Sequence, residues 1–200
     1  MASTISIEDI KKLKELTGVG LTDAKGALVE ANGDFDKALE AMRKKGLTKA
    51  EKKGDRETRE GVIDSYVHSD RIGVIVEVNC ETDFVARLPE FKEFAHHIAM
   101  QIAAMSPKYS TMEDIPAADY DAKKKELLES DALKSKPAEM AEKIVEGQLK
   151  KHFAEQVLSE QVFVLDDSMT VGERIKEQIA KSGENIRVAQ FKRIELGVNE

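Results

Sequence analysis

Apolar and polar residues recur along the chain with two different periods. In residues 1–46 the apolar positions return every three or four residues, as they do on one face of a helix. Gly18, Gly33 and Gly46 follow the three apolar stripes, at positions where a glycine commonly ends a helix. The pattern predicts a module of three short helices over residues 1–46. Residues 47–60 are almost entirely polar and charged, and we interpret them as a linker.

Beyond the linker the period changes to two, which is the period of a β-strand. Val62–His68 and Arg71–Glu81 alternate on either side of a short turn, and together they predict a β-hairpin. A third alternating stretch, Asn185–Leu196, predicts another strand near the end of the chain. Its apolar positions change parity between Val188 and Phe191, which indicates a β-bulge.

Helical periods fill the sequence between these strands. Pro89–Met105 has a strong apolar stripe, and a more highly charged helix is expected at about residues 117–130. Two further helices, the second beginning at Val171, predict an antiparallel helical hairpin at about residues 137–182. The fold class that follows is α+β: residues 61–200 would form a small antiparallel three-stranded sheet with packed helices and the hairpin.

The second predicted strand ends in an unusual sequence, Thr82-Asp83-Phe84-Val85. Thr82 and Asp83 can end a strand and cap a turn of helix with their side-chain oxygens. Phe84 places a large aromatic ring in a connection, where polar residues are usual. In one interpretation Phe84 folds back onto the core; in the other it is an exposed ring on a rigid support that enters a partner. The residues alone leave both interpretations open.

Composition and charge restrict the classes of partner. The net charge is −7 and the pI is near 5.3, which argues against general nucleic-acid binding. Residues 43–59 contain eight basic and three acidic side chains, and we interpret them as a solvated linker helix rather than a contact for RNA or an acidic partner. No apolar run approaches the ~20 residues of a membrane span. The single cysteine and the absence of a signal pattern predict a cytoplasmic protein.

Candidate chemistry is sparse. Cys80 shares its parity with the apolar face of its strand, so we expect a buried, protonated thiol. The neighbouring side chains of His96 and His97 would point about 100° apart on a helix, which disfavours a shared metal. His68, at the end of a strand, is typical of a solvated surface residue. We therefore predict a non-enzyme without metal or cofactor that acts through its surfaces.

Several motifs together resemble the elongation factor Ts family. They are Leu16–Lys25 (LTGVGLTDAK), Ala31–Asp34 (ANGD), Val78–Ala86 (VNCETDFVA) and Lys143–Gly147 (KIVEG), in that order along nearly the whole chain. Members of that family are guanine-nucleotide exchange factors for elongation factor Tu, and their amino-terminal module resembles ubiquitin-associated (UBA) domains. The resemblance implies that elongation factor Tu is the partner, without direct binding of nucleic acid or membrane.

The resemblance also implies roles for individual residues. Thr82 to Val85, with the ring of Phe84 and the carboxylate of Asp83, would enter the nucleotide domain of the GTPase and dislocate magnesium, so that GDP leaves and GTP can bind. His68 matches a family histidine at the same interface. Val19 and Leu21 would be contacts made by the amino-terminal module, next to Thr22, where many relatives have an apolar residue.

Oligomeric state and alternative functions stay open at this stage. The chain resembles the short form of the family, with one sheet-bearing unit, for which a homodimer that supplies the missing surface is one arrangement. The first alternative function is a UBA-like binding adaptor without exchange activity, in which Phe84 is buried. The second is an enzyme that uses Cys80 or His68.

Overall fold

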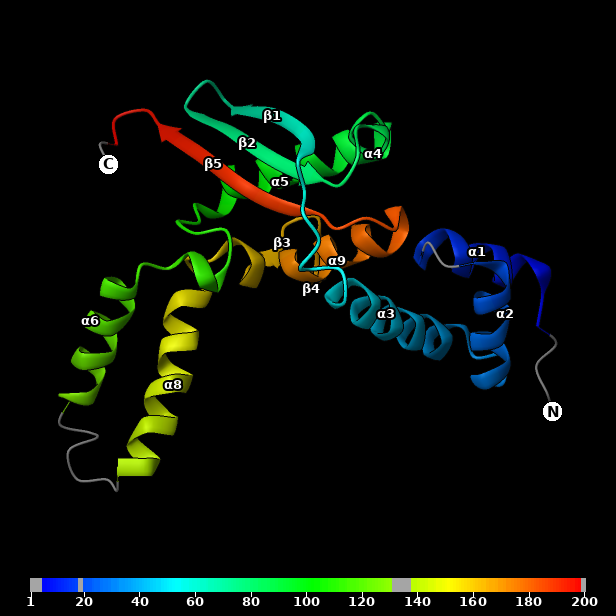
Figure 1. Cartoon of the computed structure of the whole chain (residues 1–200), viewed down its shortest axis with the longest axis horizontal. Coiled ribbons are helices and arrows are strands. Elements are labelled where there is room, and N and C mark those ends of the chain that lie inside the picture. Colours follow the sequence, from blue (N-terminus) through cyan, green and yellow to red (C-terminus); the bar gives the residue numbers. More distant parts are fainter. Residues whose placement is uncertain (1–4, 18–19, 131–137, 199–200) are drawn as a thin grey trace.

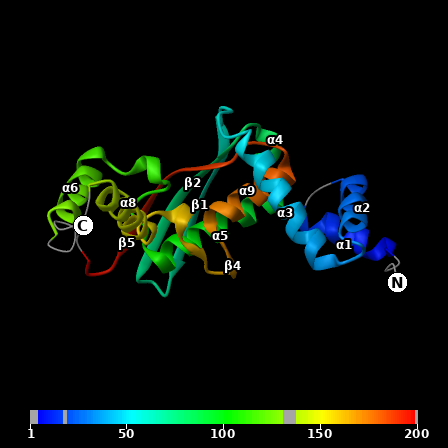
Figure 2. The same ribbon diagram turned by 90° about the horizontal axis from the view of Figure 1, so that it is seen from below.

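The structure, a computed structural model, describes residues 5–17, 20–130 and 138–198. A three-helix module lies at one end of the molecule, a sheet with its covering helices in the middle, and a pair of helices at the other end (Figure 1). The view from below shows the same order along the long axis (Figure 2). None of the described helices is long and apolar enough to cross a membrane.

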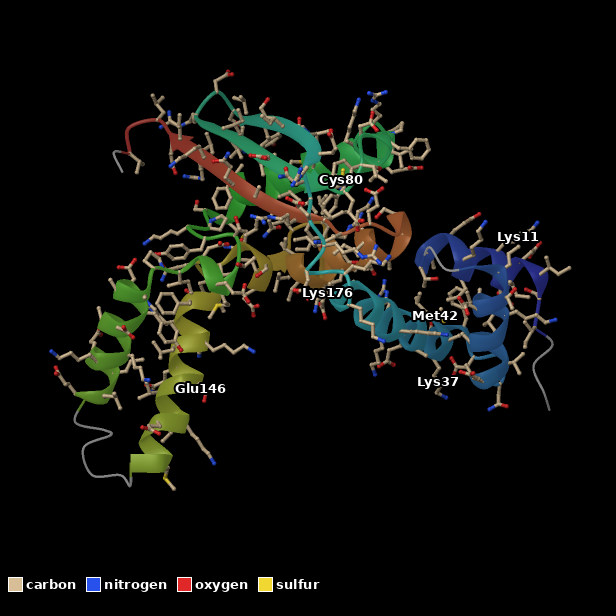
Figure 3. All side chains as sticks on the ribbon, viewed as in Figure 1. Lys11, Lys37, Met42, Cys80, Glu146 and Lys176 are labelled. Carbon is tan, nitrogen blue, oxygen red and sulfur yellow. The ribbon has the colours of Figure 1, made fainter. Side chains whose placement is uncertain are left out.

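The amino-terminal module consists of α1 (Ile7–Thr17), α2 (Leu21–Glu30) and α3 (Phe35–Glu51), as the apolar stripes predict. Asp34 caps α3, since its carboxylate accepts a hydrogen bond from the backbone N–H of Lys37 at 3.1 Å. The module has an apolar core of its own, which includes Met42, labelled in Figure 3. Its buried members are Leu13, Ala24, Ala27, Leu28, Ala38 and Met42.

The prediction that Gly46 ends the third helix is wrong, because α3 continues through it to Glu51. Gly46 is buried against α9 (Val171–Ser182), and a Cβ built on it would lie 3.5 Å from the Cβ of Ala180. Ala50, one turn further along α3, belongs to the apolar core of the sheet. Packing between α3 and α9 therefore extends the helix into the expected linker and attaches the module to the rest of the protein.

The central sheet is antiparallel, with β2 (Ile72–Cys80) between β1 (Glu60–His68) and β5 (Arg187–Glu195). The β5 bulge is confirmed: Gln190 pairs with Glu77 and Val188 with Val78, which leaves Ala189 as the extra residue. One face of β2 packs on α5 (Pro89–Met105), a helix whose bounds match the prediction. The buried residues of that face are Val74, Val76, Val78 and Cys80.

The prediction of a helical hairpin at about residues 137–182 is wrong, because each of its two helices packs against a different helix. The helix α8 (Ala138–Ala154) packs against α6 (Ala117–Leu128), where the rings of Tyr120 and Phe153 stack with centroids 5.8 Å apart. The helix that begins at Val171 packs against α3 instead. The sequence favoured the wrong pair because α6 is highly charged and supplies only partly buried apolar residues to this cluster. The arm formed by α6 and α8 thus has a core separate from that of the sheet.

Short elements complete the described chain. They are α4 (Asp83–Ala86), η1 (Met112–Asp114), η2 (Leu158–Glu160), β3 (Val162–Phe163) and β4 (Asp166–Thr170). The small hairpin of β3 and β4 was not expected. It is held to α5 by the buried amide of Gln101, which donates to the carbonyl of Val162 and accepts from the N–H of Val164 at 3.1 and 2.8 Å. Polar bonds between distant segments thus fix a stretch that is too short to show a period.

The separate core of the amino-terminal module predicts that it unfolds on its own when weakened. Leu13→Ala removes a fully buried side chain and should cost about 2–5 kcal/mol, a large part of what so small a core supplies. We expect amide hydrogen exchange to accelerate over α1 to the middle of α3 while β1, β2 and β5 stay protected. The exposed Leu16, changed to Ala, is the matched control and should have a much smaller effect. Equal loss of protection in module and sheet would contradict separate cores.

Candidate functional site

The turn after β2 holds Phe84 in solvent. Thr82 caps α4, with its Oγ1 accepting a hydrogen bond from the N–H of Val85 at 3.4 Å. Adjacent side chains on a helical turn point about 100° apart, so they cannot all face the core. Val85 is 5% exposed and belongs to the main core, whereas Phe84 is 74% exposed. The interpretation in which Phe84 folds back onto the core is therefore wrong.

A carboxylate lies beside the exposed ring. Asp83, the first residue of α4, is paired with Arg87 at 2.8 Å, and both side chains are largely exposed. Such a surface ion pair contributes at most about 1 kcal/mol to stability. The pair therefore orients the carboxylate without burying it, and leaves an aromatic ring and a negative charge next to each other on one small projection.

His68 lies at the opposite end of the sheet from Phe84. Cys80, just before the turn, pairs with Glu60 at the start of β1, whereas His68 at the end of β1 pairs with Ile72. The Cys80–Glu60 pair and the His68–Ile72 pair are eight residues apart along the strands, which at about 3.3 Å per residue corresponds to about 26 Å. The structure thus does not bring these two predicted site residues together.

His68 belongs to a group of polar aromatic side chains that the sequence did not reveal. Its Nδ1 lies 2.9 Å from the hydroxyl of Tyr66, whose ring meets that of His96 edge to face. The Nδ1 of His96 in turn lies 2.8 Å from a carboxylate oxygen of Asp64. These residues come from β1 and from α5, two elements about 30 residues apart, so no local spacing could have signalled the group.

The amino-terminal module has one of its two predicted contacts at the exposed start of α2. Leu21, the first residue of α2, is 53% exposed, and Thr22 beside it is exposed too. Val19, the other predicted contact, lies outside the described residues. Glu15 of α1 lines a cavity of about 440 Å³ together with Val85 and with residues of α5 and α9. The module and α4 therefore border one hollow.

Comparison with known proteins assigns the family. The model of the family described as "Elongation factor TS" matches residues 42–198. The chain is 54% identical over 194 residues to elongation factor Ts of Thermotoga sp. (strain RQ2), covering 96% of each chain. The chain belongs to the elongation factor Ts family. The chloroplastic elongation factor Ts of Rhodomonas salina is 50% identical over 199 residues, which cover 98% of this chain and 91% of the relative.

Membership of the elongation factor Ts family makes the chain a factor of translation elongation, as the motifs imply. The family match includes the whole sheet, the turn with Phe84, and the helical arm. It begins within α3, so most of the amino-terminal module precedes it. The relatives cover that module as well, because each alignment includes 96% or more of this chain.

Cys80 is part of the support of the turn rather than a reactive group. It lies where β2 meets α4, as Figure 3 shows, and its thiol donates to the carbonyl oxygen of Thr82 at 3.2 Å. Burial, and next the nearby carboxylate of Glu184, raise the pKa of the Cys80 thiol to about 11. The thiol is therefore protonated at neutral pH and is a poor nucleophile.

The raised pKa of Cys80 predicts a loss of stability in alkali. Between about pH 9 and pH 11 the unfolded chain loses the thiol proton while the folded chain keeps it. The folded state then binds more protons, so the free energy of unfolding falls as pH rises, by at most about 1.4 kcal/mol per pH unit. Urea unfolding at several pH values measures this slope. Cys80→Ala should show a shallower decrease, and identical slopes in the two proteins would contradict the assignment.

Proposed function

We propose that this elongation factor Ts family member is a guanine-nucleotide exchange factor that binds elongation factor Tu carrying GDP and inserts the turn Thr82–Val85 into its nucleotide domain. The observation that carries the proposal is the 74% exposure of Phe84 on a turn whose next residue, Val85, is anchored in the core. The adaptor alternative required a buried Phe84. The enzyme alternative used Cys80 or His68, and of these two Cys80 is buried, with a thiol whose pKa is raised to about 11.

The proposed mechanism needs no covalent step. The ring of Phe84 would enter an apolar site of the GTPase, and the Asp83 carboxylate beside it would disturb the polar groups that hold magnesium and the nucleotide phosphates. Magnesium would be dislocated, GDP would leave, and GTP would bind. By linkage, the factor and the nucleotide weaken each other's binding to the same extent, so incoming GTP releases the factor.

One aromatic ring does not supply enough free energy for this exchange. A shift of the GTPase from closed to open by ~10⁴ corresponds to about 5.5 kcal/mol. Burial of a phenylalanine contributes about 1.5–3 kcal/mol, and a strong hot-spot residue about 4 kcal/mol. We therefore propose that Leu21, Val19 and His68 make further contacts. With His68 at the far end of β1, the partner would extend along the strand.

The elongation factor Ts fold also leaves an apolar sheet face open, opposite α5, and we propose that a second copy of the chain covers it. Ile63 and Ile75 are exposed there and border a cavity of about 210 Å³ together with Glu77 and Lys192. The face therefore has an apolar centre and charges of both signs. A two-fold interface places the same face on itself, so Glu77 of one copy could meet Lys192 of the other.

The homodimer is tested by a charge at the centre of that face. Ile75→Lys should weaken self-association at least tenfold, because an unpaired charge would be buried between two apolar surfaces. Light scattering over a range of protein concentrations gives the mass of the particle. Lys192→Ala, at the edge of the same face, should weaken self-association less than Ile75→Lys does. A wild-type protein that stays monomeric at all concentrations would sink the proposal.

The exchange function is tested by release of labelled GDP from purified elongation factor Tu. The wild-type chain should accelerate release, and Phe84→Ala should lower this acceleration roughly tenfold to several-hundredfold, since burial of the ring contributes about 1.5–4 kcal/mol. Leu128→Ala is the matched control: Leu128 is an exposed apolar residue on α6, in the arm, which lies well away from α4 (Figure 1).

Each outcome of the GDP assay separates the proposals. An unchanged rate in Phe84→Ala, with circular dichroism showing an intact fold, would remove the ring from the mechanism. No acceleration by the wild-type chain would instead favour the adaptor. Sensitivity of the rate to Cys80→Ala, with an intact fold, would favour the enzyme.

A further inference from the structure

The turn that carries Phe84 is bonded at its base to a segment about 100 residues further along the chain. Glu184 lies between α9 and β5, and its Oε2 accepts hydrogen bonds from the backbone N–H groups of Glu81 and Thr82, both at 3.0 Å. Its Oε1 accepts a third bond from the hydroxyl of Thr82 at 2.6 Å. One carboxylate therefore holds the first two peptide groups after β2.

The carboxylate of Glu81 in turn accepts a hydrogen bond from the segment that carries Glu184. The Oε1 of Glu81 accepts from the backbone N–H of Asn185 at 2.6 Å and lies 3.4 Å from a guanidinium nitrogen of Arg56. The buried side-chain amide of Asn185 donates to the carbonyls of Gly54 and Arg56 at 3.0 and 2.7 Å. Charge-assisted bonds of this kind are stronger than bonds between neutral groups. The negative charges of Glu81 and Glu184 are thus tolerated in the same region, because each carboxylate accepts hydrogen bonds from N–H donors.

Glu184 is itself held in place by the end of α9. Gly183 has a left-handed conformation with φ of 80°, and its N–H donates to the carbonyl of Ile179. The carbonyl of Gly183 accepts a bond from Lys53 at 2.6 Å, and the N–H of Glu184 donates to Ser182. The carboxylate is therefore placed by a capped helix rather than by a free loop.

The turn needs such a support, because α4 has only four residues and one helical turn is not stable by itself. Its orientation depends on two anchors, the buried side chain of Val85 and the bonds at Thr82. The Thr82 hydroxyl takes part in both, since it donates to Glu184 and accepts from the N–H of Val85. The N-cap bond of α4 and the bond to Glu184 therefore share one oxygen atom, Oγ1 of Thr82.

We infer that Glu184 is a positioning residue for Phe84: its carboxylate fixes the direction in which α4 presents the ring to a partner. The effect on nucleotide exchange rests on the proposed exchange function, whereas the role of Glu184 in fixing the turn does not. Without the carboxylate, the residues before α4 gain conformational freedom that binding must remove again. Binding and exchange then become less efficient although the ring itself is unchanged.

The inference is tested first in the isolated protein. Glu184→Ala should accelerate hydrogen exchange at the amides of Glu81, Thr82 and Val85 at least tenfold, while amides in the middle of β2 keep their protection. Glu184→Gln is the conservative variant. Its amide oxygen can accept from both backbone N–H groups and its NH₂ can donate to the Thr82 hydroxyl, so it should restore most of the protection.

The second measurement is release of labelled GDP from elongation factor Tu as a function of factor concentration. Glu184→Ala should lower the ratio of maximal rate to half-saturating concentration about ten- to hundredfold, as expected when one or two residues regain freedom at about 1.4 kcal/mol each. Glu184→Gln should stay within a few-fold of wild type. Glu57→Ala, which removes an exposed carboxylate paired with Arg59, controls for the loss of one negative charge.

A double variant decides whether Glu184 acts through the ring. If it does, Glu184→Ala should cause little further loss in a chain that already carries Phe84→Ala. A full additional loss in that background, or unchanged amide exchange in Glu184→Ala, would overturn the inference. If the wild-type chain fails to accelerate GDP release, the exchange function fails, and the amide exchange alone still decides whether Glu184 fixes the turn.

Discussion

The direction of adjacent side chains on one turn of helix is the constraint on which the proposed site depends. Val85 and Ala86 are both buried in the main core, and Phe84 lies about 100° and about 200° from them around the helix axis, so its ring points into solvent. An exposed phenylalanine is unfavourable by itself, and a flexible loop would allow it to collapse onto the nearest apolar surface. The structure prevents this by continuing a central β-strand directly into the turn and by bonding the base of the turn to Glu184.

The length of the sheet is a second constraint, because it determines how far the surface contacted by the partner must extend. Phe84 and His68 mark the two ends of the β1–β2 hairpin, and the amino-terminal module borders the Phe84 end through α1. A partner that touches all three regions must extend over the length of the β1–β2 hairpin as well as to the module. Such an extended contact agrees with the free energies involved, because one aromatic ring cannot open a nucleotide site and several separate contacts can.

Local patterns in the sequence predicted most elements of the fold. The bounds of α5 and α9 and the bulge at Ala189 were readable because periodicity and parity are properties of neighbouring residues. The extension of α3 through Gly46 and the pairing of α8 with α6 were not, since both depend on contacts between distant segments. At the site, the motif identified Thr82 to Val85, but nothing local indicated Glu184, which reaches the turn only in the folded chain.

The exposure of Phe84 shows what the motif alone could not decide. The sequence Thr-Asp-Phe-Val is compatible with a ring that closes the core and with a ring that leaves it, and burial is the more frequent outcome for phenylalanine. What distinguishes the two cases is whether the core already has an occupant at that place. Here Val85 and Ala86 of the same turn already belong to the main core, together with Phe91 and Phe94, so the core has no need of Phe84. A ring that stability does not require can be retained for binding, and a rigid support makes that binding efficient because little order remains to be imposed.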